Sequence, residues 1–173
     1  AGCGFHASQA GLCSVCFKKL TQGNNGNNNG NNVNANVKRN TESVLKSEER
    51  VGQCVIEIRH GDLTLERVDA IVNAANSSLD HAAGVAGAIA RAGGELIQRD
   101  SDAFVDTHGR LETGESVALP GHELRAKFVI HAVGPTFQND GTDDFMLELT
   151  VRGALAAAEE KKCTSIAIPA ISS

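Results

Sequence analysis

The pattern of apolar and polar residues from about residue 41 onward predicts strands that alternate with helices. Short runs with strand character occupy residues 53–58, 68–72, 116–119, 128–133 and 165–168. Helical spacing of apolar residues covers residues 84–92, 95–107 and 143–161. Because strands separated by helices pack in layers, the pattern predicts an α/β sandwich with a largely parallel sheet.

The first 40 residues have a different pattern. Between Gly23 and Asn36, 12 of 14 residues are Asn or Gly. Such a tract buries little apolar surface and cannot offset the entropy lost on ordering, so it predicts a flexible linker. The chain therefore divides into a small segment at residues 1–20, a linker at 21–40 and a globular domain at 41–173.

The N-terminal 40 residues and the globular domain also differ in net charge. The net charge is −5, and it combines +4 over residues 1–40 with −9 over residues 41–173. An acidic domain without Trp or Tyr is poorly suited to bind a phosphate backbone or stacked bases, so we expect no direct binding of nucleic acid. No apolar run approaches the roughly 20 residues that a membrane-spanning helix needs, and we expect no membrane partner. An anionic ligand would have to be bound mainly by backbone amides.

The cysteines give an expectation about location. Five is an odd number and no secretory signal is visible, which makes a disulfide framework the weaker interpretation. We expect a cytoplasmic or nuclear protein.

Candidate chemistry lies in loops after predicted strands, where α/β sheets bind ligands. These loops are residues 61–64, 73–85 and 170 onward. The second loop places two amides, Asn73 and Asn76, ahead of small residues that open a helix, and helix N-termini bind phosphate through free N–H groups. Asn side chains both donate and accept, which suits sugar hydroxyls. The loop therefore favours a nucleotide-sugar or phosphate site; the alternative is a plain turn with tight helix packing.

Five blocks with domain-like spacing carry a resemblance to a known family. They are GDLT at Gly61–Thr64, VDAIVNAANSSL at Val68–Leu79, HAAGVAGAIARAGG at His81–Gly94, FVIHAVGP at Phe128–Pro135 and SIAIPAIS at Ser165–Ser172. Together, over about Cys54 to Ser173, they resemble the macrodomain family of ADP-ribose-binding modules. The resemblance implies a three-layer sandwich with a mixed, largely parallel sheet, and ADP-ribose as a ligand rather than a cofactor.

The resemblance also implies roles for individual residues. Asp62 would accept a hydrogen bond from the adenine amino group, with the backbone amide of Leu63 beside it. Asn73 and Asn76 would hold the distal ribose, and His131 would be structural. The diphosphate would be bound by backbone amides at the start of the helix, those of Gly84, Val85 and Ala86. Ser172 would bind the ligand from the start of a second loop.

Three departures from the family pattern shape the functional hypotheses. Alanines stand at 82 and 83 where many members have glycine, and Ala86 stands where the deacylating branch usually has Asp. In the family, the run PAIS continues into a second glycine-rich loop, a helix and a strand, so we expect the C-terminal part of the domain to be missing. We therefore expect a reader of ADP-ribose or ADP-ribosylated proteins; the alternatives are a weak ADP-ribosyl-protein hydrolase that depends on Asn76, and a scaffold.

The N-terminal segment carries a possible metal site. Cys13 and Cys16 have metal-ligand spacing, with Cys3 and His6 nearby. The run CGFHASQAGLCSVCFKK resembles the second half of an A-twenty-type zinc finger, which implies zinc as cofactor and ubiquitin as a partner. Either these four residues complete one site, or the thiols belong to an unstructured stub.

Overall fold

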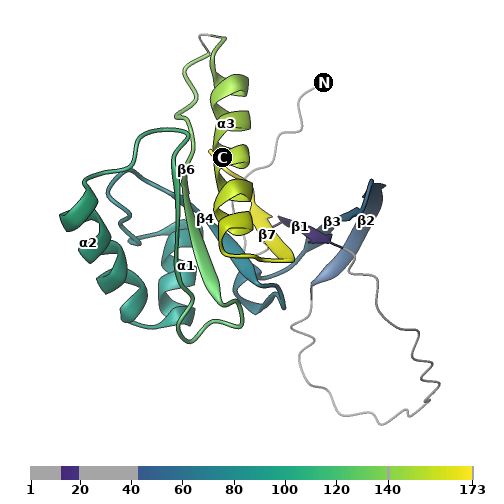
Figure 1. Cartoon of the computed structure of the whole chain (residues 1–173), viewed down its shortest axis with the longest axis horizontal. Coiled ribbons are helices and arrows are strands. Elements are labelled where there is room, and N and C mark those ends of the chain that lie inside the picture. Colours follow the sequence, from purple (N-terminus) through teal and green to yellow (C-terminus); the bar gives the residue numbers. More distant parts are fainter. Residues whose placement is uncertain (1–12, 20–42, 140, 173) are drawn as a thin grey trace.

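The computed structural model describes residues 13–19, 43–139 and 141–172, and it confirms the predicted alternation of strands and helices (Figure 1). The elements are β1 (Cys13–Lys19), β2 (Val44–Val51), β3 (Cys54–His60), the 3-10 helix η1 (Leu63–Leu65), β4 (Ala70–Ala75), α1 (Gly84–Gly93), α2 (Leu96–His108), β5 (Ser116–Pro120), β6 (Phe128–Val133), α3 (Asp143–Glu160) and β7 (Ser165–Pro169). None of the helices in these ranges is long and apolar enough to span a bilayer.

The strands form one mixed sheet with the order β2-β3-β1-β7-β4-β6-β5. Only β4 with β6 and β4 with β7 pair in parallel; the other pairings among the described strands are antiparallel. The mixed sheet that the family resemblance implied is therefore confirmed, whereas the prediction that it is largely parallel is wrong. The reason is that β1 runs antiparallel between β3 and β7, and that the outermost strands, β2 and β5, each pair antiparallel with their neighbour.

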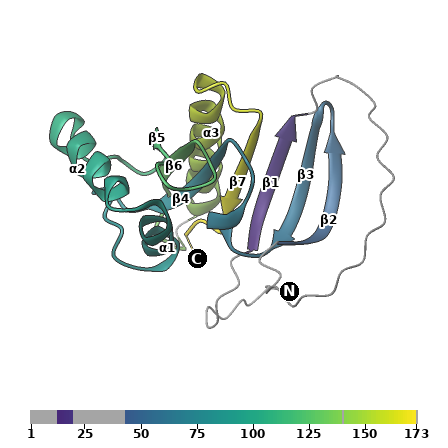
Figure 2. The ribbon, with the colours of Figure 1, turned by 90° about the horizontal axis from the view of Figure 1, so that it is seen from below.

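Helices cover both faces of the β7-β4-β6-β5 part of the sheet, as Figure 2 shows, with α1 and α2 on one side and α3 on the other. The strands supply alternate residues to the two sides. Ile71 and Val129 pack with Ile89 of α1 and Ile97 of α2, in one core cluster. Their chain neighbours Ala70, Val72 and Ile130 face α3 instead. They belong to a second cluster, which also contains Ala132, Ala154, Ala158, Ile166 and Ile168. This alternation confirms a three-layer α/β arrangement.

The described part of the predicted zinc-finger segment, residues 13–19, forms a strand. Cys13 and Cys16 both lie in β1, whose backbone pairs with β3 and with β7. A Cys-x₂-Cys zinc site needs the chain to turn between its ligands, whereas here the segment is extended in the middle of a sheet. The described residues also hold no group of three or more side chains suited to a metal ion. Cys3, His6 and the predicted linker at 21–40 lie outside the described residues.

Sheet direction brings the predicted ligand loops to one edge. Because β1 is antiparallel to both β3 and β7, the strands β3, β7, β4 and β6 all run the same way. Their carboxyl ends therefore share one edge of the sheet. The loops that follow them contain Asp62, Asn76, Gly134 and Ser172.

Candidate functional site

Asp62 lies directly after β3, and its carboxylate is held in one orientation. It is the N-cap of η1, where its Oδ1 accepts hydrogen bonds from the Thr64 backbone N–H at 2.9 Å and from the Thr64 hydroxyl at 2.7 Å. Asp62 is exposed, while Leu63 and Thr64 are buried beneath it. Both bonds use the same oxygen, so Oδ2 has no partner among the described residues and can accept a hydrogen bond from a ligand.

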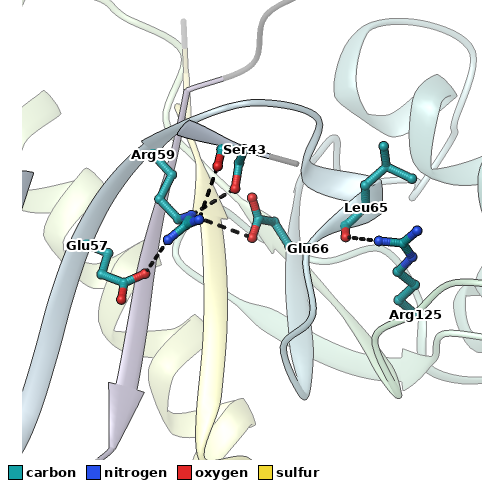
Figure 3. Close-up of polar contacts among 6 residues, drawn as sticks. All are labelled: Ser43, Glu57, Arg59, Leu65, Glu66 and Arg125. Carbon is teal, nitrogen blue, oxygen red and sulfur yellow. Dashed lines mark hydrogen bonds and ion pairs between the residues drawn. The ribbon is translucent and has the colours of Figure 1, made fainter. Parts of the chain in front are cut away.

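The loop that carries Asp62 is anchored on both sides, as Figure 3 shows. Arg59 of β3 donates from Nε to the Ser43 hydroxyl at 2.8 Å, and the same Nε lies 4.0 Å from the Glu66 carboxylate. From the opposite side, Arg125 donates from Nη1 to the Leu65 carbonyl at 2.8 Å. These contacts fix η1, so the Asp62 carboxylate is presented by a rigid segment.

Asn76 follows β4 and uses its side-chain oxygen to close a turn. Its Oδ1 accepts from the Asp80 backbone N–H at 2.9 Å and from the Ser78 hydroxyl at 3.3 Å. Its carbonyl accepts from the Leu79 N–H, and Leu79 is buried with a left-handed φ of 54°. The exposed Asn76 thus keeps Nδ2 for other partners, so this residue offers a ligand donors rather than acceptors.

Asn73 lies within β4, and its side-chain nitrogen is bonded while its oxygen is not, the reverse of Asn76. It is 1% exposed, and its Nδ2 lies 3.1 Å from Nδ1 of His131, which is also 1% exposed. The parallel register pairs these two residues across β4 and β6. Asn73 Oδ1 is buried and has no hydrogen-bond partner among the described residues. Asn73 therefore presents an acceptor, complementary to the donor that Asn76 presents.

The start of α1 leaves its first backbone amides without a side-chain cap. Ala83 is the N-cap in an extended conformation, and no described side chain bonds to the helix start. Gly84 is exposed, and its φ of 61° puts it in the left-handed region where glycine is favoured. Because free N–H groups and the helix dipole attract anions, Gly84, Val85 and Ala86 supply amides suited to a phosphate.

The loops after β6 and β7 lie against each other. A β-carbon at Gly134 would collide with the side chains of Ile171 and Ser172, which would have to move to admit it, so the two loops approach closely at this glycine. Ser172 is exposed with a left-handed φ of 61°. It thus lies at the same sheet edge as the other predicted ligand residues.

Two supporting groups were missed by the sequence prediction. Thr64 orients Asp62, and a Thr two residues after an Asp N-cap is a local signal that the sequence does contain. Gln98 of α2 accepts from both the backbone N–H and Nδ1 of the buried His81, at 3.0 and 2.8 Å. That contact joins a loop residue to a helix residue 17 positions away, and no local pattern predicts it.

Comparison with known proteins identifies the fold. The family model of the Macro domain matches residues 72–173, more than half of the chain. The chain belongs to the Macro domain family. A macrodomain variant from Oceanobacillus iheyensis, solved with ADPR, is 36% identical with a TM-score of 0.56, covering 59% of this chain and 57% of that one. The macrodomain fold expected from the five sequence blocks is thereby confirmed.

Two curated relatives extend the comparison of this macrodomain. A Thermotoga maritima protein is 52% identical over 118 residues, which is 68% of this chain and 20% of that protein. The O-acetyl-ADP-ribose deacetylase of Salmonella newport is 42% identical over 118 residues, covering 68% of this chain and 66% of the relative. The chain thus spans less than two thirds of the length of both relatives.

Proposed function

We propose that this macrodomain binds ADP-ribose, free or attached to protein side chains, at the sheet edge formed by the carboxyl ends of β3, β4, β6 and β7. The observation that carries the proposal is the complementary set of polar groups at that edge. Asp62 offers an acceptor, Asn73 an acceptor, Asn76 donors and the start of α1 backbone amides. A ligand that fits them all has an amino group, an anion and hydroxyls.

The order of these groups along the edge supports a nucleotide diphosphate sugar. The sheet order places β3, which leads to Asp62, on one side of β7, and β4 with β6 on the other. We assign the adenine to the Asp62 side, the distal ribose to the Asn73 and Asn76 side, and the diphosphate to the amides of Gly84, Val85 and Ala86. The ADPR bound by the structural relative supports the same ligand class.

Calorimetry with a series of shortened ligands tests the proposal. The full chain is titrated with ADP-ribose, ADP and AMP, beside an Asn76→Ala variant and a Glu160→Ala control at the far end of α3. We expect the wild type to bind ADP-ribose most tightly and Asn76→Ala to lose that preference over ADP, whereas Glu160→Ala matches the wild type. A wild-type chain that binds none of the three ligands would overturn the proposal.

A slow hydrolase is the second candidate function, favoured by the likeness to a relative named O-acetyl-ADP-ribose deacetylase. Ala86 is buried at the start of α1 and provides no acid or base, so water would have to be activated by the ligand's own phosphate. Positioned proton transfer typically contributes about 10²–10⁴-fold to a rate, so turnover would be slow. Asn76 would act by fixing the ribose whose C1 bond is broken.

Turnover of an ADP-ribosylated protein separates the hydrolase from a reader. We expect Asn76→Ala to abolish residual turnover and Ala86→Asp to preserve or raise it. Tight ADP-ribose binding with no turnover in either the wild type or Ala86→Asp would leave binding alone as the function. Fast wild-type turnover would show that another residue supplies the chemistry.

A further inference from the structure

Asn73 and His131 form a buried polar pair beneath the proposed ligand edge. Both side chains are 1% exposed, and Asn73 Nδ2 lies 3.1 Å from His131 Nδ1. An amide nitrogen can only donate, so His131 Nδ1 must be the acceptor. A neutral imidazole that accepts at Nδ1 carries its proton on Nε2. The contact therefore sets both the tautomer of the ring and the orientation of the amide.

The surroundings of His131 keep the ring neutral. Burial, with a smaller contribution from the nearby His81, lowers the pKa of His131 to about 3. Protonation would turn Nδ1 into a donor and break the contact with the Asn73 amide. Above that pH, Nδ1 remains an acceptor.

The contact leaves an acceptor without a partner. With Nδ2 of Asn73 bonded to His131, its Oδ1 is buried and unpaired among the described residues. A buried acceptor without a partner is unfavourable, and a donor from a ligand or a water can relieve that cost. Such an acceptor, in the carboxyl half of the strand that leads to Asn76, suits a ligand hydroxyl.

His81 repeats this arrangement beside His131. Its ring meets the His131 ring edge-on, with centroids 5.1 Å apart. Gln98 Oε1 can only accept, so His81 Nδ1 carries a proton. Nε2 is likewise buried and unpaired among the described residues. Two buried polar atoms without a partner among the described residues, Asn73 Oδ1 and His81 Nε2, thus belong to residues in contact with His131.

We propose that His131 is a positioning residue that fixes the Asn73 amide so that its Oδ1 accepts a hydrogen bond from a ribose hydroxyl of the ligand. The inference rests on the proposed ADP-ribose site and assigns the distal ribose, the part that ADP lacks, to Asn73. His131 itself touches no ligand in this arrangement. Its effect is expected only for ligands that carry the distal ribose.

Two variants of His131 separate positioning from packing. His131→Asn keeps an acceptor where Nδ1 lies. His131→Leu introduces an apolar side chain of moderate size and removes the acceptor. We expect His131→Leu to weaken ADP-ribose binding about tenfold, which corresponds to the loss of one hydrogen bond. ADP binding should change less than about twofold, and His131→Asn should restore the ADP-ribose affinity. In an Asn73→Ala background, His131→Leu should have no further effect.

The outcomes distinguish this inference from the proposed function. If the wild type binds neither ADP-ribose nor ADP, the proposed function fails and the ribose assignment fails with it. If the wild type binds ADP-ribose but His131→Leu weakens both ligands equally, or neither, only the positioning role is overturned. Should His131→Leu fail to fold, ¹⁵N NMR of the wild-type ring decides: protonation at Nε2 is expected, and protonation at Nδ1 overturns the proposal.

Discussion

At the scale of single residues, the site depends on polar side chains whose unused atoms are defined by their own hydrogen bonds. Thr64 occupies one oxygen of Asp62, and the turn after β4 occupies the oxygen of Asn76. His131 occupies the nitrogen of Asn73. Each contact leaves one kind of group for a ligand, so the hydrogen-bonding preference of the edge is set before any ligand arrives.

Asp62 gives the first test at this scale. Asp62→Ala should weaken ADP-ribose and AMP binding alike by about 1–3 kcal/mol, since the contact assigned to it is with adenine. Thr64→Val keeps the side-chain shape and removes the hydroxyl that orients the carboxylate, so its loss should be smaller but shared by both ligands. Calorimetry on both variants measures these effects. Unchanged affinity for both ligands in Asp62→Ala would remove Asp62 from the site.

Local sequence predicted which residues form the candidate site but not how each is oriented. Both asparagines appeared equivalent in the sequence, because an Asn side chain can donate and accept. The structure distinguishes them: Asn73 meets His131 across two strands, and Asn76 meets Asp80 within one turn. The first contact depends on strand register between residues 58 positions apart, which no local pattern specifies.

At the scale of elements, Asp69 joins the starts of three strands. Its carboxylate accepts from the Lys127 ammonium at 2.9 Å and from the Thr164 backbone N–H and hydroxyl at 2.8 Å each. Its backbone N–H donates to the Ser165 hydroxyl. The Lys127 hydrogen bond, supported by Thr164, holds the pKa of Asp69 well below its usual range despite partial burial.

Asp69→Asn is therefore expected to lower the free energy of unfolding by about 1–3 kcal/mol at pH 7, the range for hydrogen bonds to a charged group. A lowered folded-state pKa stabilises the fold above the unfolded pKa of about 4 and loses that effect as pH falls. The difference between wild type and variant in urea melts should then be full above about pH 5 and shrink below about pH 4. Asp106→Asn, at an exposed position of α2, serves as the control. A difference independent of pH would show that the charge of Asp69 does not matter.

Two strands, β1 and β2, were not predicted from the sequence, and each was missed for a physical reason. All eight residues of β2 are exposed, so no alternation of buried and exposed positions marks this edge strand. β1 pairs with β3 and β7, which follow it by about 40 and 150 residues. The spacing of its cysteines was interpreted as a metal site, and only pairing with distant strands shows that the segment is a strand. The strands and α-helices from β3 to β7 were all predicted, whereas the 3-10 helix η1 was not.

A proline in β1 tests whether this segment belongs to the sheet. Val15 pairs with Ile58 on one side and Ile168 on the other. Val15→Pro removes a backbone donor from an interior strand and should lower the free energy of unfolding by about 1–3 kcal/mol. Val33→Pro, in the Asn- and Gly-rich tract, should have no effect. An unchanged urea midpoint in Val15→Pro, together with one zinc ion per wild-type chain by metal analysis, would return residues 1–20 to the predicted zinc finger.

At the scale of the whole molecule, an acidic protein is proposed to bind a doubly negative ligand. The chain carries −5 overall, and residues 41–173 carry −9. The groups assigned to the diphosphate are the amides of Gly84, Val85 and Ala86 at the uncapped start of α1. Fixed dipoles at short range would have to overcome the long-range repulsion of the domain.

This balance predicts an unusual response to salt. Added salt screens the long-range repulsion between charges more strongly than it screens short-range contacts with backbone dipoles, since the Debye length falls from about 10 Å at 0.1 M to about 3 Å at 1 M. ADP-ribose affinity should therefore stay constant or rise slightly between low and high salt. Ala83→Lys, which places a cation beside the same amides, should bind more tightly at low salt and lose that advantage as salt is added. Calorimetry across the salt series measures both proteins. If wild-type affinity instead falls as steeply as that of Ala83→Lys, cationic side chains and not the α1 amides bind the diphosphate.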